Sequence, residues 1–316
     1  MRELQSSESA AIVYLRSIAM ISIVVGHLFQ SLESSLIYVF NVGVQVFLII
    51  SGYLYGHRMI VEWRQWFTKR FLKIYLPYLL FILVVIPLLF VLTKEGGAKN
   101  FIVYLSCTQG LLGGYAIEGL GHLWFLTAII ICYFITPVLQ FIREKGYSDL
   151  LIYVVILITL IDFTWQIIKP FQLSWIVLYA ISYMYPTIKK RTKLILCVLC
   201  FLAVIFIIAS SNSLPNPNSI EHLVAHMLGG ILIVGALISV FDTFKIESYP
   251  LALKVTDRYS YYVYLTHYVF LFGPLALIAL TNIILLNIMF VILAAVVSSV
   301  LLYRLHNLII RAIDFI

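Results

Sequence analysis

Charged residues are scarce in this chain: Asp, Glu, Lys and Arg make up 11% of its 316 residues. A soluble domain carries about 25% charged residues, so this chain has too few to cover a surface that faces water. Hydrophobic residues instead reach 63%, and the mean hydropathy is +1.04. The composition excludes an ordinary soluble protein and predicts an all-α polytopic membrane protein.

Cysteines and metal-ligand clusters are also few. Cys107, Cys132, Cys197 and Cys200 lie in or beside apolar stretches, so we expect buried side chains and no disulfide framework. His222 and His226 have a spacing compatible with metal binding, but no third ligand lies in an obvious position, so no metal site is expected.

The net charge of +7 does not imply a nucleic-acid partner, because in a membrane protein the placement of charges reports orientation.

Ten stretches of the chain are apolar and about 20 residues long, the length of a membrane-spanning helix. They begin near residues 10, 36, 74, 122, 149, 172, 194, 222, 259 and 283. Of the 21 basic residues, all but Lys94, Lys99 and Lys169 then fall on one side, which predicts cytoplasmic N- and C-termini. The connections are short, so residues 1–316 are expected to form a single transmembrane domain with no appended soluble domain.

One apolar segment does not fit this count. Residues 101–115 are short for a span and contain three glycines, and counting them as a crossing would put Arg143 and Lys145 outside. We interpret this segment as re-entrant or as lying along the outer interface.

Two ionisable residues lie in the first predicted span. Arg16 and His27 are eleven positions apart, close to three helical turns, so both side chains share one face of the helix. In one interpretation Arg16 extends to the inner interface and His27 caps the outer end. In the other, the pair lines a polar cavity, where an imidazole can accept a proton from a hydroxyl and a guanidinium can bind an anion.

A basic segment follows the second predicted span, which has Gln45 near its middle and ends with Ser51 and Gly52. Within this segment Arg70 and Lys73 are three positions apart, so on an α-helix they would project together and could bind a phosphorylated ligand. The positive-inside bias explains the charge equally well, and small residues such as Gly52 also permit close helix packing.

Two further histidines lie in predicted spans, where an ionisable side chain costs free energy. His122 opens the fourth predicted span next to Trp124, for which an interfacial aromatic belt is the simplest explanation. His267 lies about eight residues inside the ninth predicted span and needs a hydrogen-bonding partner there. A structural role and a functional role are equally compatible with His267.

Five stretches together resemble the acyltransferase-3 family of integral membrane acyltransferases. They are the Arg16-to-His27 spacing, GVQVFLIISGYL, FTKRFLKIYLPY, GHLWFL and SYYVYLTHY, which occur in this order over nearly the whole chain. The ten predicted spans agree with the core of that family.

The resemblance implies an O-acyltransferase in the plasma (inner) membrane of a bacterium. The donor would be cytoplasmic acyl-CoA, most commonly acetyl-CoA, and the acceptor a hydroxyl of an envelope, capsular or exopolysaccharide sugar. Transfer would be completed in the membrane or passed to a separate extracytoplasmic partner. Direct transfer and a relay through acylated His27 are both compatible with the sequence.

The resemblance also implies residue roles. His27 would be the catalytic histidine with Arg16 as its partner, and acyl-CoA would bind at Ser51, Gly52, Lys69, Arg70 and Lys73. Apart from the resemblance, His122, Trp124, His267 and Gln45 are candidates for lining a substrate cavity. Two residues depart from the family: Lys73 replaces a usual second Arg, and Gln45 stands where an acidic residue is frequent.

Two other functions are compatible with this sequence. A transporter or exporter of a lipid-linked or oligomeric glycan would also carry Arg and His inside the membrane. A non-catalytic scaffold of a glycan assembly complex would tolerate His27→Ala. Dependence on acyl-CoA and on Arg70 and Lys73 distinguishes the acyltransferase from the transporter.

Overall fold

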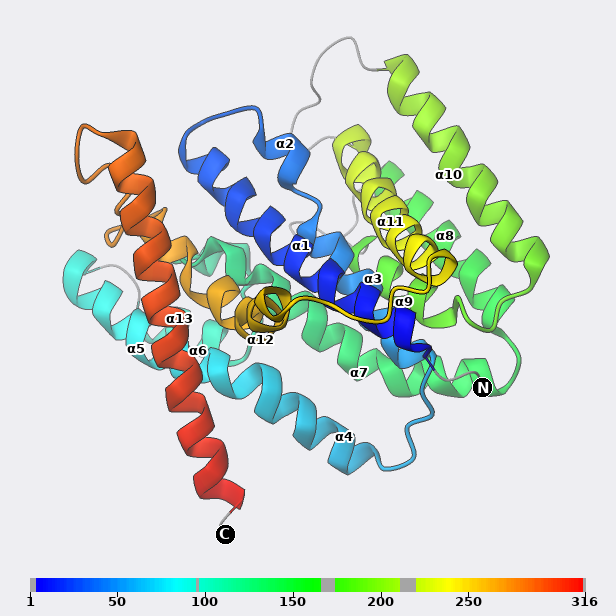
Figure 1. Ribbon diagram of the computed structural model, residues 1–316, viewed down its shortest axis with the longest axis horizontal. Helices are drawn as coiled ribbons and strands as arrows, with labels where there is room; N and C mark the ends of the chain where they lie inside the picture. The colour runs from blue at the N-terminus through cyan, green and yellow to red at the C-terminus, as the bar shows by residue number, and fades with distance from the viewer. Residues whose placement is uncertain (1–3, 95–96, 166–173, 211–219, 315–316) are drawn as a thin grey trace. The chain divides into compact units, whose positions relative to one another are not determined.

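The computed structural model of the chain describes residues 4–94, 97–165, 174–210 and 220–314, and all regular structure in these ranges is helical (Figure 1). Six helical stretches among these residues are long and apolar enough to cross a membrane: Ser6–Ser31, Ile37–Gly56, Trp63–Thr93, Gly121–Glu144, Val224–Thr243 and Ile284–Ile313. The chain is therefore a multi-pass membrane protein. Two shorter apolar helices are Ser148–Thr159 and Trp175–Met184, and the predicted span start near Gln172 lies outside the described residues. The count of ten spans stays a prediction.

The ninth predicted span differs from the structure. Its first residues continue helix α12 (Leu251–Thr266), which begins eight residues earlier than Tyr259 and ends one residue before His267. A 3₁₀ turn, η4 (Tyr268–Phe270), and irregular backbone then lead to α13 (Ile284–Asp314). The helix cannot continue through this stretch because Gly273 has a φ of +80° and Pro274 has no N–H to donate. Apolar composition alone could not reveal this break.

The third predicted span also begins earlier than its apolar residues suggest. Helix α4 (Trp63–Arg70) continues through a π-helical turn, η1 (Phe71–Tyr75), into α5 (Leu76–Thr93). The segment 101–115 forms no helix of spanning length. It contains the end of α6 (Ala98–Leu105) and a short 3₁₀ turn, η2 (Gly113–Tyr115).

The described chain forms two compact units. The first comprises Met1–Ile23, Tyr38–Met59 and Ala128–Pro250, and the second comprises Val24–Ile37, Ile60–Thr127 and Leu251–Ile316. Helices α1 (Ser6–Ser31), α2 (Ile37–Phe40) and α7 (Trp124–Glu144) contribute residues to both units.

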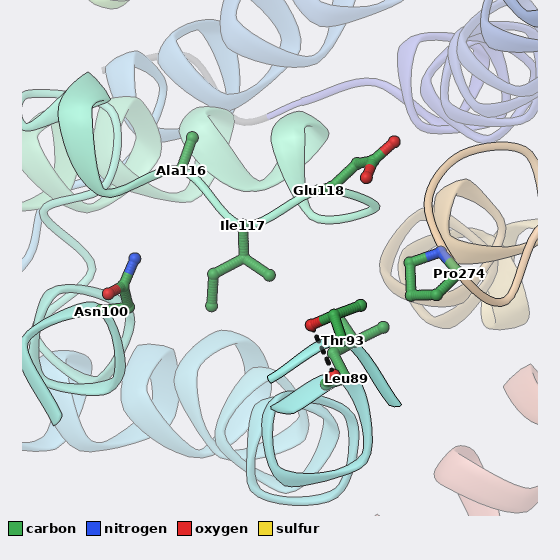
Figure 2. A pocket seen from close by; sticks show the side chains of 7 residues that line it. All are labelled: Leu89, Thr93, Asn100, Ala116, Ile117, Glu118 and Pro274. Atoms are coloured by element: carbon green, nitrogen blue, oxygen red, sulfur yellow. Dashed lines mark hydrogen bonds between the residues drawn. The ribbon is translucent and has the colours of Figure 1, made fainter. Parts of the chain in front are cut away.

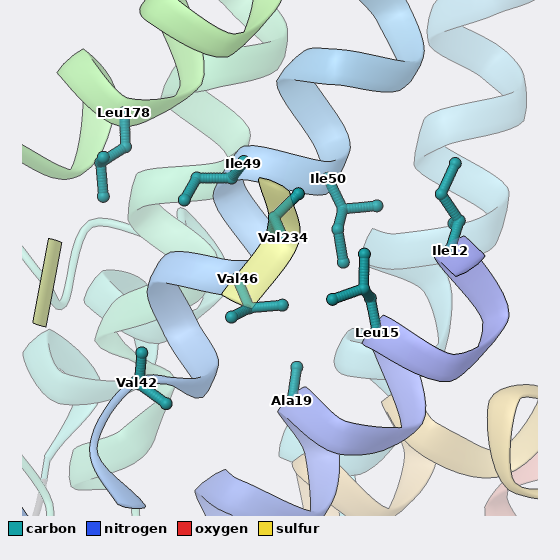
Figure 3. Close-up of a cluster of buried hydrophobic side chains, with 9 residues drawn as sticks. All are labelled: Ile12, Leu15, Ala19, Val42, Val46, Ile49, Ile50, Leu178 and Val234. Atoms are coloured by element: carbon teal, nitrogen blue, oxygen red, sulfur yellow. The ribbon is translucent and has the colours of Figure 1, made fainter. Parts of the chain in front are cut away.

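In the first unit, α3 (Gly43–Gly56) is the central helix. It packs most extensively on α9 (Ser174–Met184) and also on α11 (Ile220–Thr243), while α8 (Ser148–Trp165) packs on α9 and α10 (Lys190–Ser210) on α11. Figure 3 shows the buried apolar cluster around α3, whose members are Ile12, Leu15, Ala19, Val42, Val46, Ile49, Ile50, Leu178 and Val234. Lipid tails are as apolar as these side chains, so close packing is what favours this association.

Glycines allow α3 to approach α9 so closely. Gly52 and Gly56 are one helical turn apart, and a Cβ on either would collide with a backbone carbonyl of α9, that of Tyr179 or Tyr183. The spacing is that of small residues at a transmembrane helix interface. Gly52 therefore has a packing role in this unit.

A buried arginine holds the end of α3. The guanidinium of Arg143, which is 7% exposed, donates to the carbonyl oxygens of Gly56 at 2.6 Å and Arg58 at 2.9 Å. It also lies 4.9 Å from the centre of the Tyr183 ring. Arg143 thus satisfies the last carbonyl of α3, which has no intrahelical N–H partner, and one carbonyl of the segment that follows the helix.

In the second unit, α5, α12 and α13 pack on one another, and α6 packs on α5. The Tyr78 hydroxyl donates to the carbonyl of Tyr104 at 2.6 Å, which ties α5 to α6. The Tyr104 hydroxyl in turn accepts a hydrogen bond from the backbone N–H of Ile117 at 3.1 Å. These bonds fix the start of the loop that leads to His122.

Candidate functional site

Three histidines from separate parts of the second unit come together. His27 lies near the end of α1, His122 lies in the 3₁₀ turn η3 (Gly121–Leu123), and His267 directly follows α12. The ring centre of His267 is 5.1 Å from that of His27 and 5.3 Å from that of His122. We call these three residues the histidine cluster.

The three histidine residues differ in exposure. His122 and His267 are 3% and 0% exposed, whereas His27 is partly exposed. His27 is therefore the most exposed residue of the three.

Hydrogen bonds hold the histidine cluster in place. His27 Nδ1 lies 2.8 Å from His267 Nε2, and His267 Nδ1 lies 3.0 Å and 2.9 Å from the carbonyl oxygens of Val263 and Tyr264. His122 Nε2 lies 3.2 Å from the carbonyl oxygen of Leu265. The end of α12 thus supplies carbonyl partners to two of the three rings, because the last carbonyls of a helix lack intrahelical donors.

Two tyrosines complete the surroundings of the histidine cluster. The Tyr264 hydroxyl donates to the carbonyl oxygen of His122 at 2.6 Å. The Tyr268 ring lies 4.7 Å from the His122 ring and 4.8 Å from the His27 ring, centre to centre. The sequence reasoning did not single out these tyrosines, although both belong to the aromatic stretch SYYVYLTHY.

The loop before His122 is locked against the turn after His267. Gly119 and Gly273 have φ values of +82° and +80° and face each other so closely that a Cβ on Gly273 would lie 3.1 Å from the Gly119 nitrogen. A Cβ on Gly121 would lie 3.3 Å from the Tyr268 hydroxyl. Side chains at these positions would separate the two segments, so the glycines contribute directly to the position of His122.

A small pocket lies beside the same loop. Its lining comprises Leu89, Thr93, Asn100, Ala116, Ile117, Glu118 and Pro274 (Figure 2). In Figure 2 the Thr93 hydroxyl is bonded to the carbonyl of Leu89, at 2.9 Å. No histidine lines this pocket, so we do not assign it to the histidine cluster.

Four predicted site residues belong to the first unit: Arg16, Gln45, Ser51 and Gly52. Arg16 lies on the same continuous helix as His27, as the sequence predicted, but in the segment of α1 that belongs to the first unit. Gln45 is 1% exposed, and its amide nitrogen donates to the carbonyls of Asn41 and Val42 when the amide is oriented to face them. Their proposed contacts with substrates stay predictions.

The other predicted residues belong to the second unit. Lys69 and Lys73 are exposed and Arg70 is partly exposed. Arg70 ends α4 and Lys73 lies within the π-helical turn η1, so the α-helical geometry that we assumed for their common face does not hold there. A π-helix has wider turns, and such turns are frequent at functional sites. Trp124 begins α7 and packs against Phe125, with ring centres 6.4 Å apart.

The histidine cluster does not have the arrangement of a metal centre. Within the described ranges, no group of three or more His, Cys, Asp or Glu side chains is placed to hold a metal ion. The two facing nitrogens of His27 and His267 are hydrogen-bonded to each other, so they do not converge on a common point. The arrangement suits proton transfer, because the most exposed histidine of the cluster is hydrogen-bonded to a buried one.

Most of the chain matches a known protein family. A protein-family model described as an acyltransferase domain matches residues 9–304 of the chain. Neither the curated proteins nor the solved structures gave a significant match. The matched range includes all three residues of the histidine cluster.

Proposed function

The chain belongs to the acyltransferase-3 family of membrane acyltransferases, and we propose that it is an O-acyltransferase, most simply an O-acetyltransferase. It moves an acyl group from cytoplasmic acyl-CoA to a hydroxyl of a cell-envelope, capsular or exopolysaccharide sugar. It acts in the plasma (inner) membrane of a bacterium, with both termini in the cytoplasm. The observation that carries the proposal is a partly exposed His27 bonded to a buried His267 inside a membrane acyltransferase.

His27 is the base in this proposal. A sugar hydroxyl is a weak nucleophile, and a positioned imidazole that removes its proton accelerates attack by about 10²–10⁴-fold. The acyl thioester supplies an electrophilic carbonyl and a thiolate leaving group. Arg16, on the same helix, is proposed to bind a negatively charged part of a substrate.

His122 is proposed to contact the acceptor sugar. Its Nε2 faces the carbonyl of Leu265, so Nε2 carries the hydrogen and Nδ1 is a hydrogen-bond acceptor. Nδ1 is buried and has no hydrogen-bond partner among the described residues. Because an unpaired buried acceptor is costly, a sugar hydroxyl that donates to it would be favoured. Trp124 and His267 complete the proposed cavity lining.

Lys69, Arg70 and Lys73 are proposed to bind the phosphates of coenzyme A. The support is the charge and exposure of this segment, since phosphate groups favour clustered basic side chains. Lys73 acts there as a point charge, because lysine cannot form the bidentate phosphate contact of an arginine.

The deciding experiment measures O-acyl groups in the cell. Envelope polysaccharides are isolated from a deletion strain that carries the wild type, an empty vector, His27→Ala or the control His226→Gln, and their O-acyl signals are recorded by proton NMR. We expect the signals with the wild type and the control only, because His226 bonds the carbonyl of Tyr38 at 2.7 Å and a glutamine can keep this bond. Unchanged O-acylation with less or shorter surface polysaccharide in the deletion strain would instead support a glycan exporter.

A further inference from the structure

The end of α12 determines which nitrogen of His267 carries hydrogen. His267 Nδ1 faces two carbonyl oxygens, those of Val263 and Tyr264, at 3.0 Å and 2.9 Å. A carbonyl oxygen can only accept, so Nδ1 must donate. In a neutral imidazole the other nitrogen, Nε2, then has a lone pair and can only accept.

The position of the hydrogen on His267 also determines which nitrogen of His27 carries hydrogen. Its Nδ1 lies 2.8 Å from His267 Nε2, and this bond needs one hydrogen between the two nitrogens. Since His267 Nε2 has none, His27 Nδ1 donates. The neutral His27 ring consequently has its own lone pair on Nε2.

The relative orientation of the two rings supports this bond. Their planes differ by 18°, and their centres are 5.1 Å apart although the facing nitrogens are 2.8 Å apart. The rings thus meet edge to edge in nearly one plane. Imidazole lone pairs and N–H bonds lie in the ring plane, so this is the geometry of a hydrogen bond and not of face-to-face stacking.

We propose that His267 is a positioning residue that holds His27 as the tautomer with its hydrogen on Nδ1 and its lone pair on Nε2. The tautomer follows from the contacts above, whereas its use in acyl transfer rests on the proposed function. A buried neutral imidazole here has the orienting task that a carboxylate has in many hydrolases. None of the described contacts of the His27 ring involves a carboxylate.

In the transfer step, a proton moves through His27 Nε2 while the acyl group moves from sulfur to the sugar oxygen. The O–H bond of the sugar breaks as its proton moves to His27 Nε2, and the oxygen forms a bond to the acyl carbon. The carbon–sulfur bond breaks, and its electron pair leaves with the sulfur of coenzyme A, which takes the proton back from Nε2. Throughout, His27 Nδ1–H remains donated to His267 Nε2, which stabilises the charged ring between the two proton transfers.

The tautomer can be measured by nitrogen-15 NMR of the full-length protein in detergent micelles, with its seven histidines labelled. The His27 signal is assigned by its loss in His27→Gln. We expect the Nδ1–H tautomer in the wild type and in the control His226→Gln, and a shift toward the Nε2–H form in His267→Leu. An Nε2–H ring in the wild type, or a His27 signal that His267→Leu leaves unchanged, would overturn the proposal.

Kinetics provide a second readout. With acetyl-CoA as donor and polysaccharide from the deletion strain as acceptor, kcat should fall roughly 10²–10⁴-fold in His267→Leu, while KM for acetyl-CoA stays unchanged. His267→Gln should restore part of kcat, because its amide oxygen can accept from His27 Nδ1. No rescue by glutamine, with both variants folded, would contradict the proposal.

The two readouts separate this inference from the proposed function. If the tautomer is as expected but acetyl-CoA is never consumed, the proposed function fails and the positioning of His27 stands. If transfer occurs and the tautomer differs, only the positioning fails. If His267→Leu does not fold, the tautomer of His27 in the wild type and the kcat of His267→Gln still test the proposal.

Discussion

At the scale of single residues, the partly exposed His27 should matter most for the reaction. We expect His27→Ala to lower acyl transfer by about 10²–10⁴-fold, since the proposed general base is lost, while the apolar helix α1 still inserts. Transfer is measured as O-acyl groups on polysaccharide, and membrane insertion by the amount of protein in the membrane fraction. Full transfer at normal abundance would remove His27 from the mechanism.

Cys107 provides a prediction about reactivity. Its side chain is buried, and burial raises the pKa of the thiol to about 12 because the thiolate is poorly solvated there. The thiol is therefore protonated at pH 7 to 9, and only above that range does the reactive thiolate appear. In a variant in which Cys132, Cys197 and Cys200 are replaced by alanine, a maleimide should label the denatured protein but not the folded one. Rapid labelling of the folded protein at pH 7 would contradict this description of the site.

At the scale of helices, the contact between α3 and α9 should not tolerate a larger residue. A Cβ at position 52 would collide with the carbonyl of Tyr179, so we expect Gly52→Ala to destabilise the protein by about 1–3 kcal/mol. Gly235 in α11 is a matched control, because no atom lies within 4 Å of an added Cβ there. Thermal unfolding in detergent should show a lower Tm for Gly52→Ala and no decrease for Gly235→Ala. Equal effects would show that the close approach of α3 to α9 is not the cause.

The second prediction at this scale concerns the stability of Arg143 variants. Arg143→Met leaves the carbonyls of Gly56 and Arg58 without the donor that they have in the structure, which should cost about 1.5–3 kcal/mol. Arg143→Lys keeps the charge but not the forked geometry, so it should lie between the wild type and the Met variant. The Tm of each variant in thermal unfolding measures its loss of stability. A Met variant as stable as the wild type would mean that these bonds contribute little.

At the scale of the whole molecule, the distribution of basic residues predicts the topology. Alkaline phosphatase, which is active only outside the cytoplasm, should be active when fused after Gly97 or Thr281. It should be inactive when fused after Gly146, after Ser248 or at the C-terminus, because eighteen of the 21 basic residues are then cytoplasmic. An active fusion at the C-terminus would show that the number of spans is odd.

The sequence by itself determined the class of the protein. With 11% charged residues the chain cannot cover a water-facing surface, so the helices must lie in the membrane, and the structure shows only helices in the described ranges. The stretches from GVQVFLIISGYL to SYYVYLTHY were enough to predict the family, which the family model confirms over residues 9–304. The sequence also singled out each histidine of the cluster as a candidate site residue. An ionisable side chain in an apolar stretch costs free energy, so it needs a partner or a function there.

Only the tertiary structure decided how these residues meet. His27, His122 and His267 are far apart in the sequence, and nothing in their local patterns says that they share a site. Helix α12 ends at Thr266, and its last turn places carbonyls where two imidazoles can use them. The π-helical turn at Phe71–Tyr75 likewise changes the geometry between Arg70 and Lys73. Composition and periodicity describe one helix at a time, whereas a tautomer is set by contacts between segments.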